Sequence, residues 1–136
     1  MARKNWYEIA APEKIVSPSL LVYPDRIEKN IRLMIAIIGD VTRLRPHIKT
    51  HKTGEIIEMQ MQHGIQKFKC ATIAEAELLA KCGARDILLA MQPVGANLNR
   101  FFKLIATYPN SEFSTIVDNN TSIDHISNMA ASKNVT

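Results

Sequence analysis

Residues 67–92, KFKCATIAEAELLAKCGARDILLAMQ, read as one strand–helix–strand unit. Lys67–Ile73 is a short β-type run, and Thr72 begins the S/T-x-x-E spacing of a capping box that opens a helix. Gly83 is a natural stop for that helix. Asp86–Gln92 is almost continuously apolar, as in strands that protein covers on both faces. Two strands joined through a helix by short loops predict a parallel βαβ unit.

The same alternation of β-type runs and helical periods extends in both directions from this unit. Because it repeats, we predict an α/β fold with a parallel sheet. The further predicted elements are a strand over Val41–Lys49, a helix over Glu55–His63, a helix with its stripe over Leu98–Ile105, a strand over Phe113–Asp118, and a last helix capped by Asn119 or Asn120.

The first 40 residues are expected to form a lead-in rather than part of the repeat. Pro18–Tyr23 (PSLLVY) reads as an extra strand. Asp25 is the predicted N-cap of the helix that follows, whose apolar stripe includes Ile27, Ile31 and Ile35.

The chain of 136 residues is short for the architecture that this repeat suggests. A TIM-type barrel needs about 250 residues. We therefore expect residues 41–136 to be the first four βα units, roughly half of such a barrel, in the N-terminal part of a longer protein. A complete small open α/β domain is the alternative.

Composition narrows the class of protein. Hydrophobic residues make up 46% and charged residues 22%, the balance of a globular domain. No apolar run approaches the ~20 residues of a membrane span, so we expect no membrane association. Cys70 and Cys82 fit neither a disulfide framework nor a zinc pair, which favours a reducing cytoplasm.

The stretch LRPHIKTHKTGE, residues 44–55, concentrates positive charge on the predicted strand Val41–Lys49. Side chains alternate on a strand, so the apolar and the basic positions separate onto opposite faces. A row of cations facing inward costs several kcal/mol unless partners or an anionic ligand are present. The row also ends where parallel α/β folds place their active sites. Leu44, Pro46 and Ile48 are expected on one face, and Arg45, His47 and Lys49 on the other, with His51 continuing the basic series.

Lys49 is the residue of greatest chemical interest in this row. A partly desolvated lysine beside other cations has a lowered pKa, and its neutral amine can form a Schiff base with a carbonyl. Arg45, His47 and Lys52 supply the cationic surroundings and could also hold carboxylate or phosphate groups. We therefore predict Lys49 as a covalent catalytic residue.

The stretch allows three other interpretations. His47 and His51 would pair around a metal on a helix, but four residues of strand span about 13 Å, too far for one ion. A nucleic-acid-binding edge would interleave aromatic residues with the charges, and none is present here. A solvated basic strand without a function is the third. We expect neither a metal site nor a nucleic-acid partner.

Two polar residues follow later predicted strands. Gln92 and Asp118 lie at carboxyl ends, where pocket residues of parallel α/β folds gather. We predict them as pocket residues, with loop capping as the alternative.

Arg45-Pro46-His47-Ile48-Lys49-Thr50-His51-Lys52-Thr53 resembles the R-P-H-x-K-T-H-K segment of the D-threonine aldolase and eukaryotic-type D-serine dehydratase family. These are pyridoxal-phosphate enzymes with an alanine racemase-like barrel of fold type III. The similarity runs over essentially the whole chain, and three further segments agree with it: residues 17–23, 71–77 and 86–90.

The resemblance implies a lyase that acts on D-hydroxy amino acids. Lys49 would bind pyridoxal phosphate as a Schiff base, Arg45 and His47 would tune or orient groups near it, and His51 would line the substrate pocket. The resemblance also implies that the Pro18–Tyr23 strand belongs with a C-terminal β-domain, which would supply a divalent metal site from outside this chain. We expect a homodimer for the full-length protein.

Two alternatives to the lyase stay open. One is an amino-acid racemase that uses the same lysine, and the other is a non-catalytic or truncated protein that binds pyridoxal phosphate.

Overall fold

The computed structural model describes residues 5–135 as a row of helices along a short sheet. The helices are Pro24–Ile38 (α1), Gly54–Gln62 (α2), Ile73–Lys81 (α3), Ala96–Thr107 (α4) and Asn120–Lys133 (α5), and the strands are Lys67–Cys70 (β1), Asp86–Leu89 (β2) and Glu112–Thr115 (β3). Single 3-10 turns cover Pro12–Lys14 (η1), Val41–Arg43 (η2) and Ile48–Thr50 (η3).

The sheet is parallel throughout, in the order β1-β2-β3. Phe68 pairs with Ile87, and Ile87 pairs with Phe113, so the apolar residues of the three strands lie in register. Helix α3 connects β1 to β2, and α4 connects β2 to β3. The predicted α/β class with parallel βα units is confirmed.

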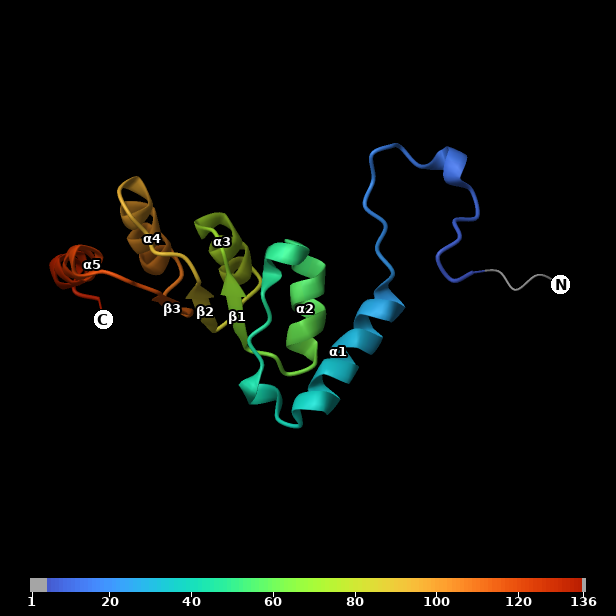
Figure 1. The fold of residues 1–136 in the computed structure, drawn as a ribbon, viewed down its shortest axis with the longest axis horizontal. Coiled ribbons are helices and arrows are strands. Elements are labelled where there is room, and N and C mark those ends of the chain that lie inside the picture. The colour runs from blue at the N-terminus through green and yellow to red at the C-terminus, as the bar shows by residue number, and fades with distance from the viewer. Residues whose placement is uncertain (1–4, 136) are drawn as a thin grey trace.

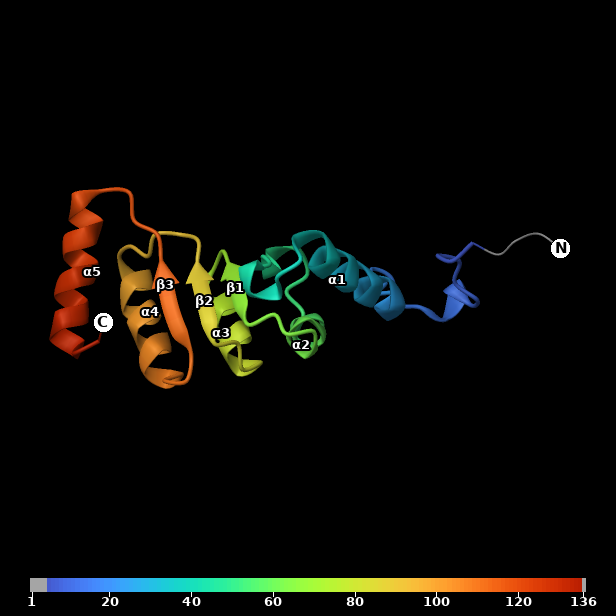
Figure 2. The same cartoon turned by 90° about the horizontal axis from the view of Figure 1, so that it is seen from below.

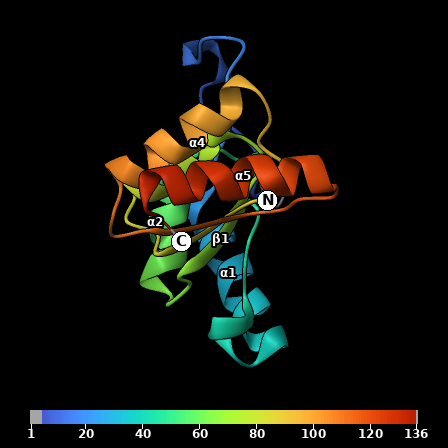
Figure 3. The ribbon, with the colours of Figure 1, turned by 90° about the vertical axis from the view of Figure 1, so that its left-hand side faces the viewer.

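The two faces of the sheet have different surroundings. Phe68, Cys70, Ile87 and Leu89 are at most 2% exposed. Helices α3 and α4 lie on one side of the strands, and α1 and α5 lie at opposite ends of the row (Figures 1 and 2). Figure 3 looks along the row from the α5 end. The core therefore lies between one face of the sheet and its helices.

No helix among residues 5–135 covers the opposite face of the sheet (Figure 2). The side chains that alternate with the core positions are partly or fully exposed, because nothing in the described chain packs over them. This open face carries Lys67, Lys69, Asp86, Leu88, Glu112 and Ser114.

The predicted strand over Val41–Lys49 is wrong. Asp40 caps the backbone N–H of Thr42 at 2.9 Å, which bends the chain into η2. The rest of the segment lies beside β1 with one isolated bridge, between His47 and Lys69. Pro46 lacks the N–H that a longer ladder would need, and η3 then turns the chain away.

The predicted strand over Pro18–Tyr23 is also absent from the described structure, where these residues form no ladder with another strand. Leu20 is 79% exposed, because no strand lies beside it to bury its side chain. Asp25 is not the N-cap of α1: Tyr23 holds that position, because Pro24 is pre-organised for the first helical residue. Asp25 lies in the first turn, where its charge favours the helix dipole.

The other elements lie where the periodicity placed them, although the strands are shorter than predicted. The Thr72 hydroxyl accepts a hydrogen bond from the Glu75 N–H at 3.2 Å, as the capping motif predicts. Asn119 caps α5 through the N–H of Ser122 at 2.9 Å. Among the described residues, no helix has both the length and the apolar character needed to cross a bilayer.

Candidate functional site

The basic stretch runs beside β1 and reaches the carboxyl-terminal edge of the sheet. Lys69 donates its backbone N–H to the carbonyl of Pro46 at 2.8 Å, which aligns the stretch parallel to β1. Ile48, fully buried, then anchors η3 in the core. Lys49 therefore sits in a tight turn just beyond the strand level, at the edge where parallel α/β proteins carry their active sites.

Lys49 is exposed to solvent. Its predicted partial desolvation is wrong for this chain, because the open face of the sheet leaves the turn uncovered. Its backbone N–H donates to Nδ1 of His47 at 3.2 Å, which holds the turn. No carboxylate of residues 5–135 lies within ion-pair distance of its ammonium group.

His47 lies between two lysines. Partial burial lowers the pKa of His47, and the positive charges of Lys49 and Lys69 lower it further. The imidazole is therefore neutral at neutral pH. Since Nδ1 accepts the Lys49 N–H, the ring proton lies on Nε2, which leaves Nε2–H as a hydrogen-bond donor.

Arg45 already has an anionic partner within the chain. Its two terminal nitrogens contact the two carboxylate oxygens of Asp86, each at 2.6 Å. The hydrogen bond with Asp86 raises the pKa of Arg45. Arg45 thus ties the stretch before Lys49 across β1 to the start of β2, and its role toward a cofactor stays a prediction.

Lys52 and Glu75 connect the turn to α3. Lys52 adopts a left-handed backbone (φ 52°), which is unusual for a residue other than glycine. Its ammonium group lies 3.4 Å from the Glu75 carboxylate, which is 5% exposed and also accepts the Ala71 N–H at 2.8 Å. One buried carboxylate therefore holds both the K-T-H-K loop and the loop after β1.

His51 points away from the other basic residues. Its Nδ1 accepts the N–H of Thr53 at 3.1 Å, and its ring lines a cavity beside α1 that Lys49 does not line. Burial lowers the pKa of His51. The structure therefore separates His51 from the group formed by His47, Lys49 and Lys69.

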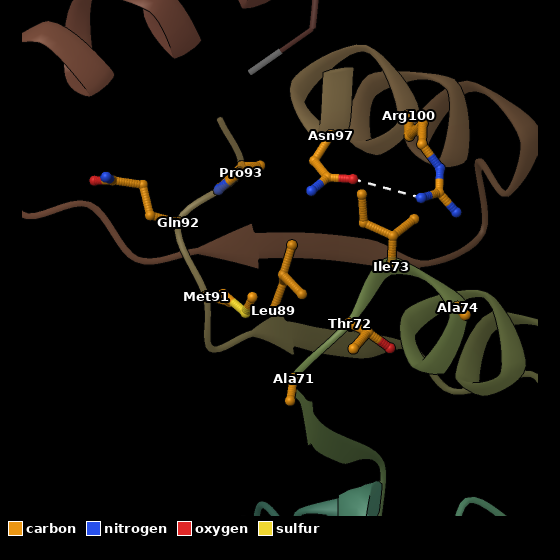
Figure 4. A pocket seen from close by; sticks show the side chains of 10 residues that line it. All are labelled: Ala71, Thr72, Ile73, Ala74, Leu89, Met91, Gln92, Pro93, Asn97 and Arg100. Atoms are coloured by element: carbon orange, nitrogen blue, oxygen red, sulfur yellow. Dashed lines mark hydrogen bonds between the residues drawn. The ribbon is translucent and has the colours of Figure 1, made fainter. Parts of the chain in front are cut away.

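Gln92 and Asp118 lie together at the same edge of the sheet. The Gln92 side-chain oxygen accepts the backbone N–H of Asp118 at 3.0 Å, so it joins the loops after β2 and β3. Gln92 also lines a cavity of about 230 Å³ between the loops after β1 and β2, shown in Figure 4 with Asn97 and Arg100. Asp118 does not line that cavity.

Metal ligands are not clustered in the part of the chain that the structure describes. No group of three or more His, Cys, Asp or Glu side chains there is placed to hold an ion.

Three residues of this region were not singled out by sequence reasoning. Lys69 follows Lys67 at the strand period, which was a usable signal for the open face. Glu75 completes the capping motif that begins at Thr72, but its contact with Lys52 comes from a loop distant in sequence and had no local signal. Asp86 starts a strand and had no local sign of its pairing with Arg45.

Residues 22–136 match the family described as "Alanine racemase, N-terminal domain". The chain is 33% identical over 76 residues to a D-threo-3-hydroxyaspartate dehydratase of Delftia sp. (strain HT23), which covers 55% of this chain and 20% of the relative. It is 34% identical over 84 residues to a D-threonine aldolase of Arthrobacter sp., which covers 60% of this chain and 22% of the relative.

A solved structure is also similar. The crystal structure of D-threonine aldolase from Filomicrobium marinum superposes with a TM-score of 0.79 at 27% identity, over 89% of this chain and 32% of the other. The chain thus spans about a fifth of the curated relatives and about a third of the solved structure.

Proposed function

Because the chain belongs to the alanine racemase N-terminal domain family, we propose that it is part of a pyridoxal-phosphate-dependent lyase acting on D-hydroxy amino acids, with Lys49 as the cofactor-binding residue. The observation that carries this proposal is an exposed lysine in the R-P-H-I-K-T-H-K segment, free of ion pairs within residues 5–135, at the carboxyl-terminal edge of a parallel sheet.

The residues present fit the chemical demands of this cofactor. An aldehyde needs an accessible primary amine, and Lys49 offers one. A phosphate needs positive surroundings, and Lys49 and Lys69 lie close enough to depress the pKa of His47. When bound, pyridoxal phosphate supplies the electron sink for bond breaking next to the amino-acid α carbon.

The chain's own residues would position the reacting groups and transfer protons to and from them. Lys49 can accept or donate a proton through its amine. His47 holds the Lys49 backbone through Nδ1, and its neutral ring carries the proton on Nε2. Arg45 fixes the segment before Lys49 by its pair with Asp86. Gln92 and Asp118 are proposed to face the substrate from the same edge, whereas His51, also predicted as a pocket residue, lines the separate cavity beside α1.

The names of the relatives support a lyase over a racemase. Both curated relatives are named for bond cleavage or elimination, an aldolase and a dehydratase. The family description names a racemase, which keeps racemisation as the second candidate. A non-catalytic protein that binds the cofactor is the third, because the chain spans 20% and 22% of those relatives.

The rest of the proposal concerns the whole protein. We propose that residues 41–136 form the first four βα units of a barrel after a lead-in over residues 1–40, with the segment that makes a single bridge to β1 in the place of the first strand. A divalent metal site, where one exists, would come from a further domain. We also propose a homodimer in the cytoplasm; the free cysteines Cys70 and Cys82 are consistent with a reducing compartment.

Attachment of the cofactor to Lys49 is the first test. The protein is incubated with pyridoxal phosphate, reduced with borohydride, and digested for mass spectrometry. We expect a pyridoxyl group on Lys49 and its loss in Lys49→Arg. Lys52→Arg, three residues away in the same loop, is the matched control and should keep the adduct. An adduct that survives Lys49→Arg would refute the assignment.

Product analysis separates the candidate reactions. With D-threonine, an aldolase releases glycine and an aldehyde; with D-threo-3-hydroxyaspartate, a dehydratase releases a keto acid and ammonia. A racemase instead forms the other configuration at the α carbon, which chiral chromatography detects. An intact adduct without any of these products would support the non-catalytic alternative.

A further inference from the structure

Glu75 is a buried carboxylate next to the loop that follows Lys49. Its side chain is 5% exposed, and carboxylates are rarely buried without partners. Glu75 is the third residue of α3, after the N-cap Thr72, and in a capping box a glutamate at this position bonds the backbone N–H of the cap. Here Oε2 of Glu75 instead accepts the N–H of Ala71, one residue before the cap, at 2.8 Å. Its other oxygen, Oε1, is left to meet Lys52.

Lys52 forms the ion pair with Glu75 from a strained backbone position. Its Nζ lies 3.4 Å from Oε1 of Glu75. Its φ of 52° is a left-handed conformation, which persists in a residue other than glycine only where the surrounding structure holds it. The N–H of Lys52 bonds the carbonyl of Ile48 at 2.8 Å, and its side chain meets Glu75. Lys52 is therefore held at both its backbone and its side chain.

The turn closed by Lys52 contains Lys49. The Ile48 carbonyl accepts the N–H of His51 at 3.1 Å as well as that of Lys52, so residues 48–52 close on themselves. Among residues 5–135 no ion pair fixes the direction of the Lys49 amine. The orientation of Lys49 therefore depends on the backbone of this turn, which Glu75 anchors to α3.

The negative charge of Glu75 also reaches other residues of the site. Burial and neighbouring lysines lower the pKa of His47, whereas Glu75 raises it. Burial raises the pKa of the Cys70 thiol, and Glu75 raises it further. Together with Lys52, these groups face the Glu75 carboxylate from the basic stretch, its loop and β1. Without Glu75 the surroundings of Lys49 would therefore be more positive.

We propose that Glu75 is a positioning residue for Lys49: through its pair with Lys52 it holds the turn so that the Lys49 amine keeps one direction toward the cofactor. The inference rests on the proposed function, because it concerns the lysine that would bind pyridoxal phosphate. Glu75 acts through Lys52 and takes no part in the chemistry. The alternative is that Glu75 only caps α3.

Hydrogen exchange of backbone amides separates these two roles without the cofactor. Glu75→Gln keeps an oxygen for the Ala71 N–H but loses the charge that pairs with Lys52. We expect the His51 amide, which is bonded inside the turn, to exchange about fivefold faster in this variant than in the parent chain. A residue that only caps α3 would leave this exchange unchanged, because opening of the turn does not break the cap.

Lys52→Met tests the same pair from its exposed side. The Lys52 side chain is 61% exposed, so its change leaves the core intact, and methionine keeps much of the aliphatic stem. The His51 amide should exchange about as fast in Lys52→Met as in Glu75→Gln, and no faster in the double variant, because all three lack one and the same pair. Glu77→Gln, an exposed change on α3, is the matched control and should leave the exchange as in the parent chain.

Reaction with pyridoxal phosphate connects the turn to the cofactor. After brief incubation and borohydride reduction, mass spectrometry gives the ratio of pyridoxyl groups on Lys49 to those on Lys29, an exposed lysine of α1. Loss of the Glu75 charge alone would raise this ratio, because more positive surroundings attract the phosphate and favour the neutral amine of Lys49. We expect the ratio in Glu75→Gln to fall by at least threefold instead, because the reaction needs a fixed amine.

Two results would overturn the role of Glu75. One is an unchanged exchange of the His51 amide in either single variant. The other is a parent chain that carries the pyridoxyl group on Lys49 together with an equal or higher ratio in Glu75→Gln. A parent chain without any pyridoxyl group on Lys49 is a different outcome, since it would overturn the proposed function itself and the role of Glu75 toward the cofactor with it.

Discussion

The pair between Arg45 and Asp86 should be the strongest of the ion pairs that the structure describes among residues 5–135. Arg45 lies four residues before Lys49, and Asp86 starts β2, so the pair joins the basic stretch to the sheet. The perturbation is Arg45→Met, which keeps much of the aliphatic stem, combined with Asp86→Ala in a double-mutant cycle.

The size of the coupling between Arg45 and Asp86 follows from the geometry of the pair and the exposure of its side chains. Two charge-assisted hydrogen bonds of 2.6 Å form a bidentate pair, and each such bond contributes about 1.5–3 kcal/mol when shielded from water. The Arg45 and Asp86 side chains are 30% and 28% exposed, so solvent screens part of the attraction between their charges. We expect a coupling free energy of about 2 kcal/mol.

Urea unfolding followed by circular dichroism measures this coupling. The pair between Arg32 and Glu28 is the matched control, since those side chains are 68% and 41% exposed on one helix face. Its coupling should be clearly smaller, because solvent screens both charges. A coupling for Arg45 and Asp86 no larger than that of the surface pair would refute the view that the pair anchors the basic stretch.

Three further predictions use other contacts. Glu75→Gln should lower the free energy of unfolding by about 1 kcal/mol through loss of the Lys52 pair. Glu77→Gln, on the exposed side of α3, is the control and should change it less in the same urea assay, because solvent screens its pair with Lys81. Burial raises the pKa of Cys70 to about 12, so Cys70 should resist iodoacetamide at pH 8 until the chain unfolds; labelling of the folded chain at Cys70 would contradict this. Folding lowers the pKa values of His47 and His51, so on acidification the unfolded chain takes up protons before the folded chain does. The free energy of unfolding should therefore be full above the ordinary histidine pKa of about 6.5 and fall as the pH drops below it. In His51→Gln this fall should be shallower.

The elements of this fold follow from local patterns that the sequence carries. The helices over residues 73–81 and 96–107 lie where apolar periodicity and the Thr72 cap predict them, because cap and stripe are interactions within one or two turns. The parallel direction of the sheet follows from the short loops and intervening helices. The basic stretch also ends at the carboxyl-terminal edge of the sheet, as predicted, although its predicted strand is reduced to one bridge with β1.

The surroundings of Lys49 could be known only from the tertiary structure. Whether residues 41–49 form a ladder depends on how far a neighbouring chain pairs with them, and Pro46 with the Asp40 cap limits that pairing to one bridge. The exposure of Lys49 depends on what covers the open sheet face.

The partners of the other basic residues were decided in the same way. Arg45 meets Asp86 across 41 residues of sequence, and His51 turns to α1 rather than to Lys49. By itself the sequence determined which elements form and which residue types they carry, because those depend on neighbours along the chain. Only the tertiary structure decided which charges are paired, which are free and which cavity each side chain lines, because those depend on neighbours in space.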